Sequence, residues 1–327
     1  MDLTVKPEVT DAAGVEVGFN NADDEWDSLE LRLNPAALAK APEATQPMKA
    51  HESGHLPTGL VTFDECWESL KSRDLTEEKK RVAQLQKEIE EQKAAKSCFK
   101  RGCWPKVCLF CRSKLSEHLE KEKETILALT KVPFSDSDQL HLRMLTTLYK
   151  SCSMSVAAAP KRYGAHWEFI GFQGTDPATD LRGAGIFGLL QLVAFATDSR
   201  NQERIKAIID LSQDTVQNFP FAIVGINVTK SVLTSLKKGR LNRICKEQNS
   251  VIRVLNALYA GGLYLFYNTW LHGRKTIEDS GFVLQKVEKE AAKRPKKLMR
   301  TKMDLTKWRL EAKKEQQQET ELTFHAI

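Results

Sequence analysis

The fold is decided by the stretch Trp167–Leu190, which reads WEFIGFQGTDPATDLRGAGIFGLL. Its end opens an apolar run, Ile186–Phe195, with hydrophobic residues on almost every side, and this pattern predicts a central helix buried in the core. Three glycines in the middle have the GxGxxG spacing of a dinucleotide-binding loop. That motif requires a strand on each side of its helix, whereas Asp176–Asp180 is typical of a turn and a helix cap. We therefore expect no nucleotide-binding loop here.

A lone arginine stands just before this helix. Asp176 and Pro177 favour a turn, and the side-chain oxygen of Thr179 or Asp180 is expected to cap the helix by accepting free N–H groups of its first turn. Arg182 then falls in that first turn. A positive charge there opposes the helix dipole and lowers local stability unless it has an anionic partner.

Two arrangements of Arg182 meet this requirement. In the first, Asp180 or Asp176 neutralises the guanidinium within the protein, and Arg182 has a structural role. In the second, Arg182 faces outward and meets an anion of another molecule. Gly183 and Gly185 have no side chains, so in this arrangement they let the backbone and phosphates of a partner come close. The residues alone leave both arrangements open.

Helical periodicity continues through most of the remaining chain. Residues 135–138 (SDSD) offer caps before the periodic run Leu140–Tyr149. The segment Phe221–Ile226 is compatible with a short strand or with the start of the helix that follows. We predict an all-α fold, with one helical domain of roughly 160 residues. Further helices are expected at about 75–97, 199–213, 227–238, 241–249 and 251–270.

Charge and proline content divide the chain into four parts. Residues 1–60 carry eleven acidic and four basic side chains and five prolines, a composition typical of a disordered acidic arm. A helical N-terminal extension (61–130) and the helical domain (131–284) follow. Residues 285–327 form a basic C-terminal helix or tail, in which 285–314 hold twelve Lys or Arg against four Asp or Glu. We expect this segment either to be solvated or to adsorb to an anionic membrane surface.

Composition argues against several classes of protein. The formal net charge of +6 over 327 residues is small for a nucleic-acid-binding protein, so no nucleic-acid partner is expected. The N-terminus shows no signal-peptide pattern, and the apolar stretch 251–270 is interrupted by Arg253, Asn256 and Asn268, which favours a core helix over a membrane span. Seven cysteines without a signal peptide favour free thiols. We expect a cytoplasmic protein, or one that associates peripherally with membranes or cytoskeletal structures.

Four of the cysteines lie close together, at Cys98, Cys103, Cys108 and Cys111. With His118 as a further ligand they are candidates for a zinc site. Zinc modules, however, usually separate their two ligand pairs by about a dozen residues, so that a loop can wrap the metal. All four thiols here occupy one short segment, which favours small buried apolar side chains instead. We expect no metal and no cofactor.

Two motifs carry a resemblance to a known family. The pattern WxxxGFQxxxPxTDxRGxG over 167–185 and the stretch FPFAIVGIN over 219–227 resemble the hallmarks of the ELMO domain. The resemblance covers about residues 130–290, close to half of the chain. Within the family, the branch with a single ELMO domain is more similar than the multidomain engulfment and cell motility scaffolds, and its third paralogue type is the most similar.

The resemblance implies an all-helical module that stimulates GTP hydrolysis by Arf-family small GTPases in their GTP-bound form, especially Arf-like ones. It also implies that Arg182 is the required residue, supplied in trans as an arginine finger. We expect Gln173, Asp180, Gly183 and Gly185 around it to contact the partner. The chemistry agrees, because an arginine supplied in trans stabilises the charge that develops on the transferred phosphoryl group and raises GTPase rates by about 10³- to 10⁵-fold.

The neighbours of Arg182 carry further expectations. Leu181 departs from the family pattern, which more often has an aromatic residue there, and this substitution is expected to loosen the helix start. Trp167, Phe169 and Phe172 are expected to anchor the loop in the core. The amide of Gln173 either helps to position the loop or a water, or, as we expect, is buried and bonded to the backbone.

Two other functions stay open at this point. The first is a non-catalytic adaptor for small GTPases, in which Arg182 is exposed but inert. The second is a metal-stabilised or nucleic-acid-binding module that uses the cysteine cluster and the basic tail. The chain has no Ser-His-Asp order, HExxH or P-loop that would indicate a self-contained enzyme.

Overall fold

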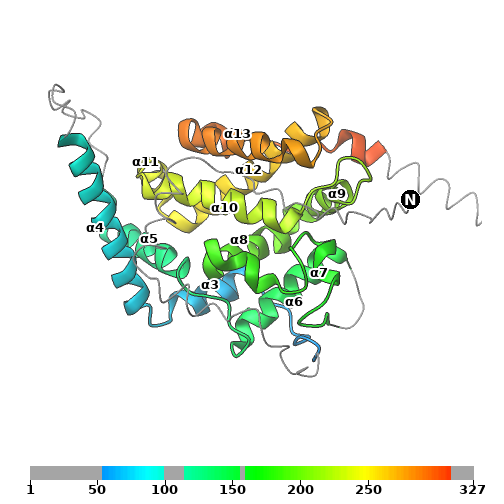
Figure 1. Ribbon diagram of the computed structural model, residues 1–327, viewed down its shortest axis with the longest axis horizontal. Helices are drawn as coiled ribbons and strands as arrows, with labels where there is room; N and C mark the ends of the chain where they lie inside the picture. Colours follow the sequence, from blue (N-terminus) through cyan, green and yellow to red (C-terminus); the bar gives the residue numbers. More distant parts are fainter. Residues whose placement is uncertain (1–53, 99–113, 155–158, 311–327) are drawn as a thin grey trace, which may run out of the picture.

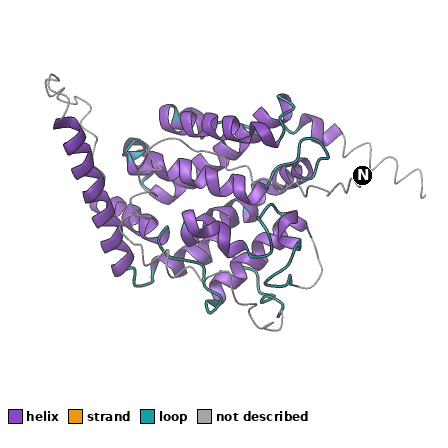
Figure 2. Cartoon of the chain, in the orientation of Figure 1, coloured by secondary structure: helices purple, strands orange, loops and turns teal. Residues whose placement is uncertain are grey.

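The computed structural model describes residues 54–98, 114–154 and 159–310. Within these ranges the chain forms α-helices and short 3-10 helices without any strand (Figure 2), and the β-type contact is an isolated bridge between His55 and Lys161. The all-α prediction is confirmed for this part of the chain. Most of the predicted acidic arm and the segment with Cys103, Cys108 and Cys111 lie outside the described residues.

Figure 1 shows the helices in their order along the chain. The helices up to the hallmark stretch are α3 (Phe63–Lys71), α4 (Thr76–Cys98), α5 (Glu117–Leu129), α6 (Gln139–Ser153) and α7 (His166–Phe169). The later ones are η1 (Pro177–Gly183), α8 (Gly185–Thr197), η2 (Ser199–Asn201), α9 (Gln202–Ser212), α10 (Phe221–Lys237), α11 (Asn242–Gln248), α12 (Val251–His272), η3 (Ile277–Asp279), α13 (Ser280–Lys293) and α14 (Pro295–Leu298).

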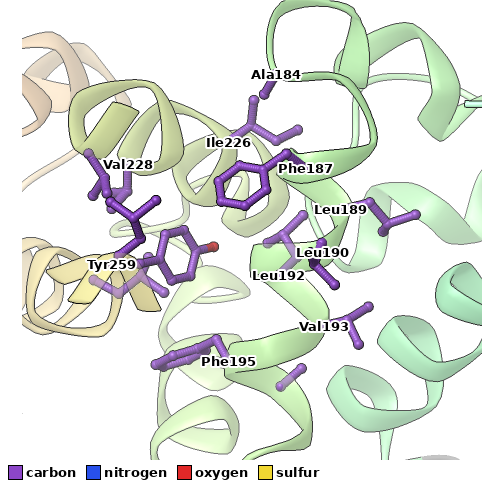
Figure 3. Close-up of a cluster of buried hydrophobic side chains, with 14 of the residues drawn as sticks. Ala184, Phe187, Leu189, Leu190, Leu192, Val193, Phe195, Ile226, Val228 and Tyr259 are labelled. Carbon is purple, nitrogen blue, oxygen red and sulfur yellow. The ribbon is translucent and has the colours of Figure 1, made fainter. Parts of the chain in front are cut away.

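The core is built around α8. All of its 13 residues are buried except Ala194 and Thr197, as the apolar run predicted. Helices α3, α6, α10 and α12 pack against it. Figure 3 shows two of these contacts, where Phe187 and Leu192 of α8 lie beside side chains of α10 and α12. A helix that is apolar on all sides is stable in water only when neighbours cover every side, and this arrangement provides that cover.

Two helix starts follow the sequence signals. Asp138 caps α6 by accepting hydrogen bonds from the amides of Leu140 and His141, at 2.9 and 3.4 Å. The segment Phe221–Ile226 is the beginning of α10, so the strand alternative is wrong. Its amides find acceptors in a distant loop, which is described below with the candidate site.

The long apolar stretch forms α12, a buried core helix as predicted. A residue of another helix caps its start: the carboxylate of Glu122 on α5 accepts hydrogen bonds from the amides of Val251 and Ile252 at 2.8 and 3.0 Å. A carboxylate at this position satisfies free N–H groups and suits the positive end of the helix dipole. In the described ranges, no helix combines the length and apolar character that a membrane span needs.

The basic C-terminal segment packs on the domain as far as the structure describes it. Helix α13 crosses position 284 without a break and lies along α10 and α12 (Figure 1). Beyond it, Leu298, Met303 and Leu305 are buried, and the Trp308 indole donates a hydrogen bond to Asp210 at 2.7 Å. The four-part division of the chain stays a prediction.

Candidate functional site

Trp167 anchors the hallmark loop in the core. Its side chain is fully buried, and its indole Nε1 donates to the carbonyl of Arg162 at 3.0 Å. Phe172 meets it edge-on, with 6.0 Å between ring centroids, so the prediction for these two aromatics is confirmed. The prediction for Phe169 is wrong, since 41% of it is exposed. Two positions along a helix correspond to roughly 200° of rotation, so the short helix α7 cannot turn both Trp167 and Phe169 inward.

Gly171 joins the two hallmark motifs into one unit. The carbonyls of Ile170 and Gly171 accept hydrogen bonds from the amides of Ala222 and Ile223, at 3.0 and 3.2 Å, and so satisfy the first turn of α10. The backbones approach so closely that a Cβ on Gly171 would lie 2.1 Å from the amide nitrogen of Phe221. The φ of Gly171 is +83°, which also favours glycine. The sequence shows both motifs, but it does not show that the carbonyls of the first motif cap the helix that begins in the second.

Asp176 starts the 3-10 helix η1. Its carboxylate accepts a hydrogen bond from the amide of Ala178 at 2.9 Å and pairs with the guanidinium of Arg162 at 2.8 Å. Arg162 is only 8% exposed and also pairs with Asp136. Thus Arg162 ties η1 to the loop before α6. Sequence analysis missed Arg162, because its ion pairs join distant positions and follow no motif.

Asp180 holds the loop that precedes η1. Its Oδ2 accepts a hydrogen bond from the backbone amide of Gln173 at 2.7 Å. Burial raises the pKa of the Asp180 carboxyl, against the opposing effects of the Gln173 amide and Arg182. The side chain of Gln173 itself is exposed, so the expectation of a buried amide is wrong. The hydrogen bond to the loop goes through the backbone of this residue.

Helix α8 begins without a side-chain cap, so the prediction that Thr179 or Asp180 caps it is wrong. The reason is that η1 occupies residues 177–183 and uses Asp176 as its own cap. The start of α8 instead docks on the backbone after α5, where the amide of Ile186 donates to the carbonyl of Val132 at 2.8 Å. Gly185 is buried with φ +54°, and a Cβ there would lie 2.5 Å from the Thr130 carbonyl oxygen.

Arg182 is exposed at the end of η1, two residues before Ala184. It therefore does not lie in the first turn of α8, and the predicted conflict with the dipole of that helix does not arise. Its guanidinium makes no hydrogen bond or ion pair with any residue that the structure describes. Asp176 is engaged by Arg162, and Asp180 is engaged by the Gln173 amide. The geometry therefore agrees with the outward-facing arrangement of Arg182.

The five predicted site residues differ in their exposure to solvent. The exposed residues are Gln173, Arg182 and Gly183, whereas Asp180 is partly buried and Gly185 is buried. Leu181 lies under this surface with 1% exposure and contacts the region of Gly188 from the start of α8. Hence the residue that departs from the family pattern is an internal anchor of η1.

The buried His141 makes the stability of the fold depend on pH. His141 is buried, and its Nδ1 accepts a hydrogen bond from the Ser135 amide at 3.1 Å. Burial lowers the pKa of His141 from 6.5 to about 4, although Asp138 opposes this shift. Between these values the unfolded chain binds more protons. Neutral His141 therefore stabilises the fold fully above pH 6.5. This contribution to the free energy of unfolding, on the order of 3 kcal/mol, is lost as the pH falls toward 4.

Denaturant unfolding of the wild type and of His141→Asn at pH 7 and pH 4.5 measures this contribution. Asparagine keeps an acceptor near the Nδ1 position but does not titrate. The wild type is expected to be more stable than the variant at pH 7, with a gap that narrows at pH 4.5. A gap that is equal at both pH values would contradict a neutral, buried His141.

Comparison with known proteins adds to this geometry. The profile of the ELMO/CED-12 family matches residues 124–284, which include η1 and Arg182. ELMO domain-containing protein 3 of Bos taurus is 32% identical over 299 residues, covering 91% of this chain and 72% of that protein. This chain belongs to the ELMO/CED-12 family. The Homo sapiens protein of the same name is 33% identical over 280 residues, covering 86% of this chain and 67% of that protein.

The family assignment confirms the resemblance inferred from the two motifs, including the similarity to the third paralogue type. ELMO domain-containing protein 2 of Mus musculus is 36% identical over a shorter region, which covers 34% of this chain and 37% of that protein. No solved structure matches the chain. Membership of the ELMO/CED-12 family supports a role connected with small GTPases.

Proposed function

We propose that this ELMO-family protein accelerates GTP hydrolysis by an Arf-family or Arf-like small GTPase, with Arg182 inserted into the partner's nucleotide site. The observation that carries the proposal is an exposed guanidinium without an ion pair in the described part of the chain, placed on a braced 3-10 helix inside the hallmark motif. A GTPase builds negative charge on the transferred phosphoryl group, and an arginine from a second protein stabilises that charge.

The brace around η1 suits this role. Asp176 caps the helix and pairs with Arg162, Asp180 holds the loop before it, and Leu181 is buried beneath it. A residue that acts on a transition state is most effective when its supporting structure is fixed before binding. These contacts hold the backbone of η1, while the Arg182 side chain at its end stays exposed and can enter another protein.

The chain itself holds no nucleotide at this position in the proposed mechanism. The GTP belongs to the partner, and the active site forms only in the complex. A cavity of about 780 Å³ lies elsewhere, between α3, η2 and α12, and Arg182 does not line it. Guanidinium also fits the chemistry better than ammonium, because its planar fork reaches two oxygens at once.

The test is GTP turnover by a panel of GTP-loaded Arf-family proteins, with and without this chain at substoichiometric amounts. The proposal requires at least one GTPase whose turnover rises with the amount of added chain. Binding to a GTP-loaded member without any rise in turnover would favour the adaptor alternative, in which the exposed Arg182 is inert. Failure to bind any small GTPase would contradict both functions.

We further propose that the protein is cytoplasmic and associates with anionic membrane surfaces through its basic segment, residues 285–314. In the described part of this segment the basic side chains are exposed, and several pair with carboxylates, for example Arg294 with Glu290 and Lys296 with Glu247. Others, such as Lys289, Lys293 and Lys297, make no ion pair with described residues. Each basic group near an anionic membrane contributes about 1 kcal/mol.

Vesicle binding is therefore expected to require anionic lipid and to weaken with salt. Raising the ionic strength from about 0.1 M to about 1 M shortens the screening length from about 10 Å to about 3 Å. Replacing Lys289, Lys293 and Lys297 together by glutamine is expected to weaken binding by roughly 100-fold, on the basis of about 1 kcal/mol for each charge. Cosedimentation with anionic and neutral vesicles measures this. Binding that ignores salt and lipid charge would rule out electrostatic adsorption.

A further inference from the structure

A second cationic side chain lies next to Gly183, the residue that follows Arg182. Lys230 of α10 reaches across to η1, and a Cβ built on Gly183 would lie 2.7 Å from both its Cε and its Nζ atoms. The ammonium group of Lys230 therefore rests over the backbone of Gly183, the residue that directly follows Arg182. Helix α10 and η1 are in contact in the fold. Lys230, which lies 48 positions after Arg182 in the sequence, therefore belongs to the same candidate site.

The positive charge of Lys230 is not neutralised by any residue in the described ranges. Its ammonium makes no hydrogen bond or ion pair there, and the side chain is partly exposed. The two carboxylates of the hallmark stretch already have other partners, since Asp176 pairs with Arg162 and Asp180 accepts from the Gln173 amide. Gly183 thus lies between Arg182 in the sequence and the Lys230 ammonium in space, and neither cation is paired with a carboxylate of the described residues. Cationic groups without carboxylate partners attract anions.

The position of Lys230 is fixed by the helix that carries it. Its neighbours Thr229 and Ser231 are buried, and α10 packs against α8 on one side and α13 on another. Lys230 also gives a reason for a glycine at position 183, which the sequence did not suggest. An alanine there would displace the end of the lysine side chain, because the space that its Cβ needs is taken by the ammonium group.

We propose that Lys230 is a second anion-binding residue of the Arg182 site and contacts an anionic oxygen of the GTP-loaded partner before the chemical step. This inference rests on the proposed function. Lysine is a compact point charge that tolerates varied geometry, whereas arginine offers a planar fork. Lys230 then contributes to the affinity for the partner, and Arg182 contributes to the rate. The oxygen belongs either to the γ-phosphate of the bound GTP or to a carboxylate of the GTPase surface.

The experiment measures stimulated GTP turnover against the concentration of a GTP-loaded Arf-family protein that the wild-type chain activates. Lys230→Gln is expected to raise the half-saturating concentration about tenfold, which corresponds to about 1.4 kcal/mol, and to leave the maximal rate within about twofold. Lys230→Arg is expected to restore most of the affinity. Gly183→Ala is expected to weaken binding as Lys230→Gln does, because it moves the ammonium while keeping its charge.

Matched controls separate this effect from a loss of fold or of general charge. Lys246→Gln removes an exposed lysine of α11 and is expected to change neither parameter. The melting temperature of every variant is measured in parallel. A Lys230→Gln protein with wild-type affinity, or with a reduced maximal rate and unchanged affinity, would overturn the inference. So would a failure of arginine to rescue.

Binding measurements show whether the anionic oxygen belongs to the γ-phosphate or to a carboxylate. They also test the Lys230 proposal separately from the proposal of GTPase activation. If Lys230 meets the γ-phosphate, Lys230→Gln weakens binding to the partner loaded with a non-hydrolysable GTP analogue and leaves the GDP form unaffected. If it meets a carboxylate, binding to both forms weakens. Should the wild type bind a loaded GTPase without activating it, the activation proposal fails while the same binding comparison still decides the role of Lys230. If no Arf-family protein binds, both proposals fall.

Discussion

Replacing Arg182 by alanine or by lysine is expected to remove nearly all of the stimulated GTP hydrolysis. An arginine finger contributes about 10³- to 10⁵-fold to the rate, and an interaction made only in the transition state affects the rate much more than the affinity. Lysine keeps the charge but loses the bidentate geometry. Both variants are expected to bind the GTP-loaded partner to a similar extent as the wild type. Single-turnover hydrolysis and a separate binding assay measure the two quantities.

Folding is expected to be unaffected in these variants, because Arg182 is exposed and its guanidinium makes no hydrogen bond or ion pair with the residues that the structure describes. Surface substitutions of this kind change stability by no more than about 0.5 kcal/mol. Arg240→Ala is the matched control, since Arg240 is also exposed and has no ion pair within the described ranges. Normal stimulated turnover by a folded Arg182→Ala protein would sink the arginine-finger proposal and favour the adaptor. A parallel loss of stability, binding and rate would point to a structural arginine.

The second large effect is expected at Gly171. An alanine Cβ there would lie 2.1 Å from the Phe221 amide nitrogen and 2.8 Å from the Pro220 Cα. Both contacts are to backbone, which cannot move aside without breaking the hydrogen bonds that cap α10. We expect Gly171→Ala to cost more than about 3 kcal/mol, which lowers the melting temperature by roughly 10 °C in a domain of this size. Thermal and urea unfolding measure the loss.

Gly174→Ala provides a close control for this substitution. Gly174 also has a positive φ, of +70°, but a Cβ there meets nothing within 4 Å. Alanine at that position carries only the backbone strain of a left-handed conformation, about 1 to 2 kcal/mol. The difference between the two variants therefore isolates the clash with α10. Equal destabilisation by both would show that the junction between the two hallmark motifs relaxes.

Local patterns were sufficient to predict much of this fold. The apolar run at Ile186 predicted the buried α8, and the SDSD stretch predicted the cap of α6 at Asp138. These features depend on residues within one or two helical turns, which periodicity and capping preferences describe. The burial of Trp167 was also predicted locally, since large aromatic side chains are mostly buried in folded proteins.

The supporting contacts of the site were not accessible in this way. Arg162 pairs with Asp136 and Asp176, Gly171 fits against Phe221, and Lys230 rests on Gly183. Each joins segments that are distant in sequence and adopts no repeating spacing. The error about the cap of α8 has the same origin, because a backbone carbonyl after α5 takes the place of a side chain. Such contacts depend on the packing of helices, and local sequence says little about that packing.

The Glu122 carboxylate, which accepts hydrogen bonds from the first amides of α12, lies outside the region that the family profile matches. The family match begins at residue 124, two positions after the carboxylate that satisfies the amides of Val251 and Ile252. It ends at residue 284, before Leu298, whose carbonyl oxygen sits so close to α12 that a Cβ on Gly261 would lie 2.1 Å away. A piece cut at the limits of the match would lose a helix cap at one end and a packing partner at the other. The region by which the family is recognised therefore leaves out two contacts of α12, one with Glu122 and one with Leu298.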